Sequence, residues 1–75
     1  MTWDYRVIKH DLVPTNYFAI HEVYYDENGK ITNWSEKPID VSGETKSEVI
    51  KTLKHMIADS EQATLKESEL EKLLS

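Results

Sequence analysis

The segment YFAIHEVYYDENGK, residues 17–30, decides the fold of this chain because it contains a strand and the turn that ends it. Asn28 and Gly29 tolerate the positive backbone φ of a type I′ hairpin turn, so we expect a strand on each side of them. The first of these strands has apolar residues on both faces. They are Tyr17, Ala19, Val23 and Tyr25 on one face, and Phe18, Ile20 and Tyr24 on the other. A short chain has little material to cover both.

Three strands are expected, at about residues 3–9, 17–26 and 30–36. The segment WDYRVIK alternates, with Trp3, Tyr5 and Val7 on one face, which is typical of a half-buried strand. Pro14 and Asn16 then indicate a connection rather than a continued strand.

The hairpin register depends on the length of its loop. A two-residue loop would place Val23 opposite Trp34 and Tyr25 opposite Thr32, whereas a three-residue loop with a glycine bulge would shift these pairs by one. We favour the two-residue loop, because Val23 and Trp34 then form a cross-strand pair on one face.

A helix is expected at about residues 46–60. The segment from Thr45 to Glu48 matches a capping box, in which the Thr hydroxyl accepts from a free amide and the Glu side chain reaches back. An apolar stripe follows at helical spacing, formed by Val49, Ile50, Leu53, Met56 and Ile57. We expect this stripe to lie on the sheet.

A second, short helix is possible at residues 67–74, with Ser68 and Glu71 as another capping pair. Its apolar side would consist of Leu70, Leu73 and Leu74. So short a helix is not stable alone in water, so it must dock or fray.

The expected fold is therefore α+β, within a single small domain of residues 1–75. It is a three-stranded antiparallel β-meander followed by an amphipathic helix packed on one face, in the order β-β-β-α. One helix covers one face of such a sheet, so the second face is left for the terminal segment, a second copy of the chain, another protein or a small ligand. Phe18, Ile20 and Tyr24 are the candidate interaction face.

Composition limits the classes of function. The 75 residues carry 14 acidic side chains against 9 lysines and arginines, for a formal net charge of -5, and Arg6 is the only arginine. Nucleic-acid binding is therefore unlikely, because it relies on basic residues that neutralise phosphates. Without cysteine, signal peptide or a membrane-length apolar run, the chain is expected to be soluble and cytoplasmic, with no membrane partner.

Motifs of common catalytic sites are missing. Gly29 and Gly43 are the only glycines, which excludes a P-loop, a dinucleotide fingerprint and a Gly-x-Ser-x-Gly elbow. His10, His21 and His55 show no pair at metal-ligand spacing, so no metal, cofactor or catalytic residue is assigned.

His21 interrupts an otherwise apolar strand and is the candidate polar site. In the favoured register it faces Glu36, and a cross-strand polar pair is the simpler interpretation. The alternative is a proton donor in an aromatic pocket with Tyr17 and Trp34, which would serve a small ligand or a catalytic reaction.

Two resemblances follow from short motifs. YRVIK at residues 5–9 and GETKSEVIKTLKHMI at residues 43–57 resemble the strand-strand-strand-helix module of HicB-like antitoxins, whose Gly-[Asp/Glu]-Thr turn is matched by Gly43, Glu44 and Thr45. The resemblance implies binding of a small ribonuclease toxin and formation of oligomers. The family's Leu-Pro-Gly loop and helix-turn-helix segment have no counterpart here.

The second resemblance runs nearly end to end. HEVYYDENGK at residues 21–30, with NWSEKP at residues 33–38, is similar to a group of small uncharacterised bacterial proteins, and it implies no activity.

The leading functional hypothesis is a non-enzymatic protein-interaction module. It would use its exposed aromatic sheet face or an edge strand to bind a second copy, as a homodimer, or a small protein partner. The alternatives are the small-ligand or catalytic site around His21 and the antitoxin-like binding of a ribonuclease.

Overall fold

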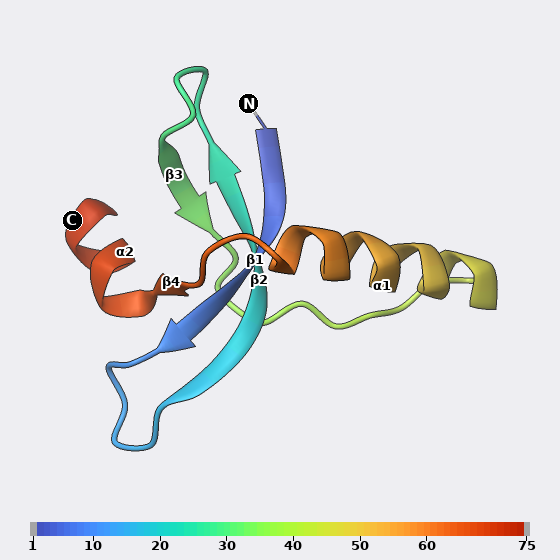
Figure 1. Cartoon of the computed structure of the whole chain (residues 1–75), viewed down its shortest axis with the longest axis horizontal. Helices are drawn as coiled ribbons and strands as arrows, with labels where there is room; N and C mark the ends of the chain where they lie inside the picture. The colour runs from blue at the N-terminus through green and yellow to red at the C-terminus, as the bar shows by residue number, and fades with distance from the viewer. Residues whose placement is uncertain (1, 75) are drawn as a thin grey trace.

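The computed structural model describes residues 2–74 and contains one sheet and two helices (Figure 1). Met1 and Ser75, the ends of the expected domain, lie outside the described residues. The elements are β1 (Thr2–His10), β2 (Tyr17–Tyr25), β3 (Ile31–Trp34), α1 (Lys46–Ser60), β4 (Leu65–Lys66) and α2 (Glu67–Leu74). The expected α+β class is confirmed, with a larger sheet than the sequence indicated.

The sheet has four strands in the order β3-β2-β1-β4 and is mixed rather than wholly antiparallel. β1 pairs antiparallel with β2, but β4 returns parallel to β1 and places Leu65 opposite Ile8. The three predicted strands form the expected antiparallel meander, but the prediction missed β4, which adds a fourth strand and a parallel pair. β4 has only two residues, too few to show an alternating pattern, and α1 provides the long crossover that a parallel pair needs.

The β2–β3 hairpin has the expected register at one end only. Val23 lies opposite Trp34, as predicted, but Tyr25 lies opposite Ile31 rather than Thr32. The register shifts next to Tyr25, and Thr32 is the extra residue, whose hydroxyl donates to the Tyr24 carbonyl at 3.3 Å. A β-bulge of this kind adds one residue to one strand.

The hairpin turn is held by Asp26 and is not type I′. The Asp26 carboxylate accepts from the amides of Asn28 and Lys30 at 2.8 and 2.9 Å. Gly29 has φ +78, whereas no non-glycine residue within 2–74 has a positive φ. A type I′ turn requires positive φ at both central residues, and Asn28 does not have it. The predicted type I′ turn is therefore wrong.

The face of the sheet that contains Ile8 and Val23 is covered by α2. Ile8 and Val23 form a buried cluster with Leu70 of α2, and all three are at most 2% exposed. Trp34 and Leu65 pack against this cluster. The possible terminal helix therefore exists and docks, so the face that contains Val23 is not left bare.

α1 begins at the predicted capping box. The Thr45 hydroxyl accepts from the Glu48 amide at 3.1 Å, and the Glu48 carboxylate accepts from the Glu44 amide at 2.8 Å. The other end of α1 is attached to the edge of β1, where the Tyr5 amide donates to Asp59 at 3.0 Å. α1 is thus fixed mainly through its C-terminal turns.

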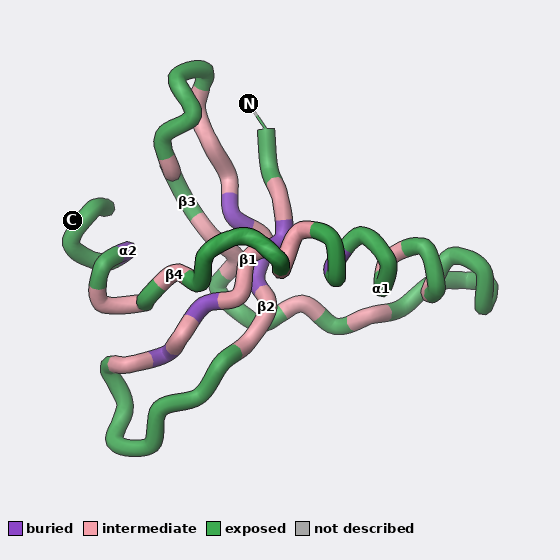
Figure 2. Tube along the Cα trace, viewed as in Figure 1, coloured by how far each residue is buried: buried purple, intermediate pink, exposed green. Residues whose placement is uncertain are grey.

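Most of the predicted apolar stripe of α1 is not covered by the sheet. Met56 is buried, but Ile50, Leu53 and Ile57 are exposed. Figure 1 shows α1 extending well beyond the strands, and in Figure 2 most of α1 is coloured as exposed. The expectation that the whole stripe lies on the sheet is wrong, because attachment at the edge of β1 leaves the N-terminal turns without strands beneath them.

Candidate functional site

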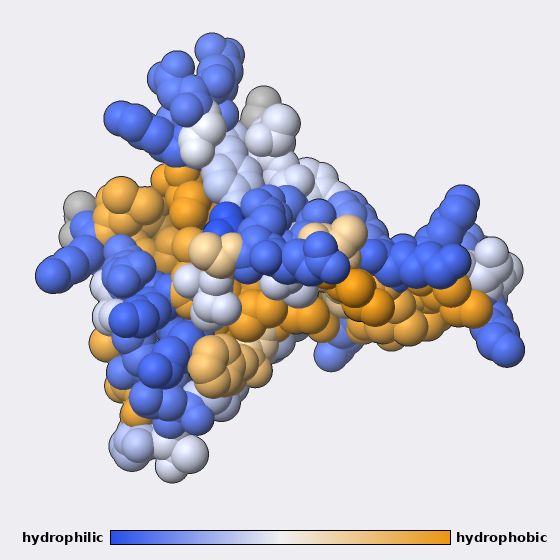
Figure 3. All heavy atoms as spheres, viewed as in Figure 1, coloured by the Kyte–Doolittle hydropathy of each residue, from blue (hydrophilic) through white to orange (hydrophobic). Residues whose placement is uncertain are grey.

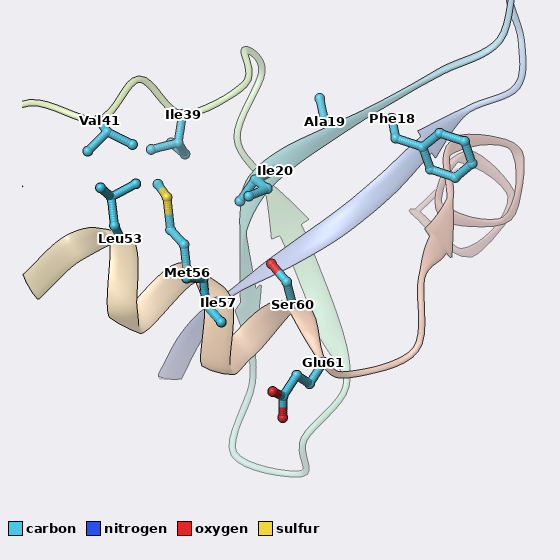
Figure 4. A pocket seen from close by; sticks show the side chains of 10 residues that line it. All are labelled: Phe18, Ala19, Ile20, Ile39, Val41, Leu53, Met56, Ile57, Ser60 and Glu61. Carbon is cyan, nitrogen blue, oxygen red and sulfur yellow. The ribbon is translucent and has the colours of Figure 1, made fainter. Parts of the chain in front are cut away.

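An apolar groove runs between α1 and the chain segment that leads into it. We call it the α1 groove; its apolar lining residues are Phe18, Ala19, Ile20, Ile39, Val41, Leu53, Met56 and Ile57. Figure 4 shows Ile39 and Val41 on one side, pointing toward Leu53 and Met56 on the other. In Figure 3 hydrophobic residues form a continuous band along this side of α1.

The wall opposite α1 is held in place by backbone hydrogen bonds to β2. The Ser35 amide donates to the Glu22 carbonyl at 2.8 Å, and the Ile39 amide donates to the Ile20 carbonyl at 2.9 Å. Pro38, which has no amide to donate, lies directly before Ile39, where the pairing with β2 resumes. The segment therefore stays beside β2 before it leaves toward α1.

The α1 groove is open to solvent. The exposed fractions are 43% for Leu53, 65% for Ile57 and 63% for Phe18, which lies at the end of the groove on β2. Large apolar side chains that are exposed together, rather than singly, indicate an interaction site.

The structure separates the three residues of the candidate interaction face. Phe18 and Ile20 line the α1 groove. Tyr24 does not: its hydroxyl donates to the Glu22 carboxylate at 2.6 Å. The apolar residues that join Phe18 and Ile20 come instead from α1 and from the segment after β3.

The candidate polar site is a buried hydrogen-bonded chain of side chains. His21 is 0% exposed, and its Nε2 lies 2.9 Å from Nε2 of His10, which is itself buried. His21 Nδ1 lies 3.0 Å from the Ser35 carbonyl and 3.1 Å from the Ser35 hydroxyl. His10 Nδ1 lies 3.3 Å from the carboxylate of Glu67, the first residue of α2.

The aromatic partners surround this chain unequally. Trp34 meets His21 edge to face, with ring centroids 5.0 Å apart. Tyr17 stacks on His10 at 4.4 Å rather than on His21. Glu36 is not the partner of His21, because β3 ends at Trp34 and Ser35 takes that position, so this predicted pair is wrong.

Burial lowers the pKa of His21 below 6.5, since the charged ring would lose its hydration. The Ser35 carbonyl opposes this shift, the nearby His10 adds to it, and Glu67 again opposes it. Both ring nitrogens of His21 already face protein groups. A substrate would have to displace one of them, so this geometry suits a structural role better than a proton donor to a ligand.

Three members of this hydrogen-bonded group of side chains were not predicted from the sequence: His10, Ser35 and Glu67. His10 and His21 point to the same face because the β1–β2 register pairs Arg6 with His21 and His10 with Tyr17. That register is not readable from the long loop between the strands. Glu67 is placed only by the docking of α2. Within residues 2–74, no group of three or more His, Cys, Asp or Glu side chains is arranged to hold a metal ion.

No family model, no curated protein and no solved structure matches this chain. The two resemblances based on motifs therefore stay predictions. Neither described helix has the length and the apolar character that crossing a membrane requires.

Proposed function

We propose that this chain is a non-enzymatic interaction module that pairs with a second copy of itself through the α1 groove. The observation that carries the proposal is the exposure of Ile50, Leu53 and Ile57 on one side of a helix whose N-terminal turns have no strands beneath them. A helix of this length is marginal in water without tertiary contacts. A partner on this surface would provide them.

A second copy is the occupant we favour, first because of the small core. The buried apolar residues within 2–74 are Tyr5, Ile8, Val23, Met56 and Leu70. Domains of this size have only a few kcal/mol of net stability, and those without disulfides or a metal often gain additional stability by oligomerisation. A partner needed for stability must be present whenever the chain is, and a second copy satisfies that condition.

The second argument is the symmetry of the stripe on α1. About Leu53, which lies on the axis, Val49 is the counterpart of Ile57. Two copies of α1 packed antiparallel about a two-fold axis at Leu53 would therefore bring apolar residues against apolar residues along the stripe. A two-fold interface requires such a self-complementary surface.

Sedimentation and light scattering from about 1 to about 300 µM test the proposal, because association depends on concentration. We expect the wild-type chain to dimerise. Leu53→Glu should weaken the dimer by at least about tenfold, since two carboxylates would meet at the axis. Lys54→Glu, on the neighbouring exposed position of α1, is the matched control and should leave the dimer unchanged.

Mixing variants tests the symmetry itself. Leu53→Lys alone should be as monomeric as Leu53→Glu, but the two mixed together should form a heterodimer, because the opposite charges face each other only if Leu53 meets Leu53. A wild-type chain that is monomeric over the whole range contradicts self-association and leaves the groove to a different protein. Dimers that persist in Leu53→Glu show that α1 is not the interface.

A further inference from the structure

The tip of the β2–β3 hairpin contains an asparagine that is followed by glycine. Asn28 and Gly29 are both exposed, and a Cβ at Gly29 would meet no atom of the more distant chain within 4 Å. The carboxamide of Asn28 forms no hydrogen bond within residues 2–74. Asparagine is a chemically labile residue, because the main-chain nitrogen that follows it can attack the carboxamide carbon. At this turn the carboxamide is free to meet that nitrogen.

The chain has two other asparagines, and each precedes a large aromatic residue. Asn16 is followed by Tyr17, and Asn33 is followed by Trp34. A bulky side chain hinders the approach to its own main-chain nitrogen, whereas glycine has no side chain. Asn33 also lies within β3, and its carboxamide oxygen already accepts from the Trp34 amide at 2.9 Å. Asn28 is therefore the asparagine best placed to react.

The Asp26 carboxylate holds the turn closed around this pair of residues. It accepts from the Asn28 amide at 2.8 Å and from the Lys30 amide at 2.9 Å. The Gly29 amide donates to the Asp26 carbonyl at 3.1 Å, so its nitrogen must leave this hydrogen bond and lose its proton before it can attack. A nearby carboxylate disfavours that loss, because it repels the anion that forms. Asp26 thus opposes the reaction both by its hydrogen bonds and by its charge.

We propose that Asn28 converts spontaneously to aspartate and isoaspartate through attack by the Gly29 nitrogen, at a rate that the Asp26 carboxylate holds down. The deprotonated Gly29 nitrogen forms a bond to Cγ of Asn28. The bond from Cγ to Nδ2 breaks, and Nδ2 leaves with a proton as ammonia. Water then opens the cyclic imide at one of its two C–N bonds. Opening at Cγ gives aspartate, and opening at the main-chain carbonyl gives isoaspartate.

Each product changes the turn. Both products add a carboxylate at position 28, beside those of Asp26 and Glu27. Isoaspartate also lengthens the main chain by one carbon atom between the two amides that the Asp26 carboxylate accepts from, so we expect at least one of these hydrogen bonds to break. The hairpin tip should then open more often. In Figure 1 this tip lies at the top and α1 extends to the right, so the proposal does not depend on self-association through the α1 groove.

Incubation of the purified chain at neutral and at mildly alkaline pH, followed by peptide mass spectrometry, tests the proposal. We expect the mass gain of an amide replaced by a carboxylate, located at Asn28, whereas Asn16 and Asn33 stay unchanged over the same period. The gain should appear faster at the higher pH, because the attacking nitrogen must lose a proton. Aspartate and isoaspartate should both form and separate in chromatography, because direct hydrolysis of the carboxamide would give aspartate alone.

Asp26→Ala removes the acceptor and its charge, so it should raise the rate at Asn28 by at least about threefold, as expected when hydrogen bonds to a charged group are lost. Glu27→Ala is the matched control, because it removes an exposed carboxylate of the same turn and leaves the hydrogen bonds to Asp26 in place; it should change the rate much less.

If Asp26→Ala fails to fold, the wild-type chain in denaturant provides the same comparison. That chain has lost the hydrogen bonds to Asp26 and should react at Asn28 faster than the folded chain. Three results contradict the proposal: an Asn28 that reacts no faster than Asn16 or Asn33, aspartate as the only product, or a rate that does not rise when the Asp26 hydrogen bonds are removed.

Discussion

Met56 and Leu53 lie one turn apart on the same stripe of α1, yet Met56 is 3% exposed and Leu53 is 43% exposed. Met56→Ala should therefore lower the free energy of unfolding by about 2–5 kcal/mol, the usual cost of truncating a buried side chain. Leu53→Ala should cost about 0.5 kcal/mol or less in the monomer. Denaturant melts at low concentration, where the monomer dominates, compare the two. Equal losses would show that Leu53 is packed within one chain.

The positive φ of Gly29 gives a second prediction. A Cβ at this position would meet no atom within 4 Å, so any loss on substitution comes from backbone strain rather than from a clash. Gly29→Val should lower stability by about 1–3 kcal/mol. Gly29→Asn should lose clearly less, because Asn tolerates this conformation. Thermal melts of the two variants compare their losses of stability. Similar losses would mean that the turn changes shape to accept either residue.

Asp11 is predicted to hold the beginning of α2. Its carboxylate accepts from the Ser68 amide at 3.0 Å and from the Ser68 hydroxyl at 2.6 Å, and these hydrogen bonds keep the pKa of Asp11 below its usual value. Asp11→Ala should increase hydrogen exchange in α2 at neutral pH, and Asp11→Asn should increase it less. Ser68→Ala should resemble Asp11→Ala if the two side chains act as a pair. Unchanged exchange in Asp11→Ala would show that Leu70 and Glu67 suffice.

Alkaline pH should destabilise the fold partly through Tyr25. Burial raises the pKa of this phenol above 10.0, and its hydrogen bond to Asp4, 2.7 Å long, adds to the shift. The unfolded chain therefore ionises first, so this contribution to stability is full below pH 10.0 and is lost as the pH rises further. Denaturant melts from about pH 9 to about pH 11 should decline less steeply in Tyr25→Phe than in the wild type. An identical decline would assign the effect to other tyrosines.

Local signals in the sequence predicted most of the secondary structure. The Asn28-Gly29 turn, the capping box from Thr45 to Glu48, and the alternation in residues 3–9 each depend on neighbouring residues, so they can be read without tertiary information. Even the Val23–Trp34 pair followed from local reasoning, although the bulge beside it did not.

The sequence did not reveal features that depend on distant residues. β4 forms only because α1 returns the chain to the free edge of β1, and its two residues show no pattern of their own. The His10–His21 contact depends on the register across a six-residue connection, and Glu67 reaches it only through docking of α2. The open groove likewise results from the angle at which α1 leaves the sheet, which an apolar stripe does not specify.

On the ribosome, β1 emerges before every other strand, whereas β4, its second neighbour, emerges only after α1. Until residues 65–74 have left the exit tunnel, Ile8 and Val23 have no Leu70 to cover them. Ile8 and Val23 are therefore exposed on an incomplete sheet for as long as α2 has not emerged and docked, and such transiently exposed apolar surface favours aggregation.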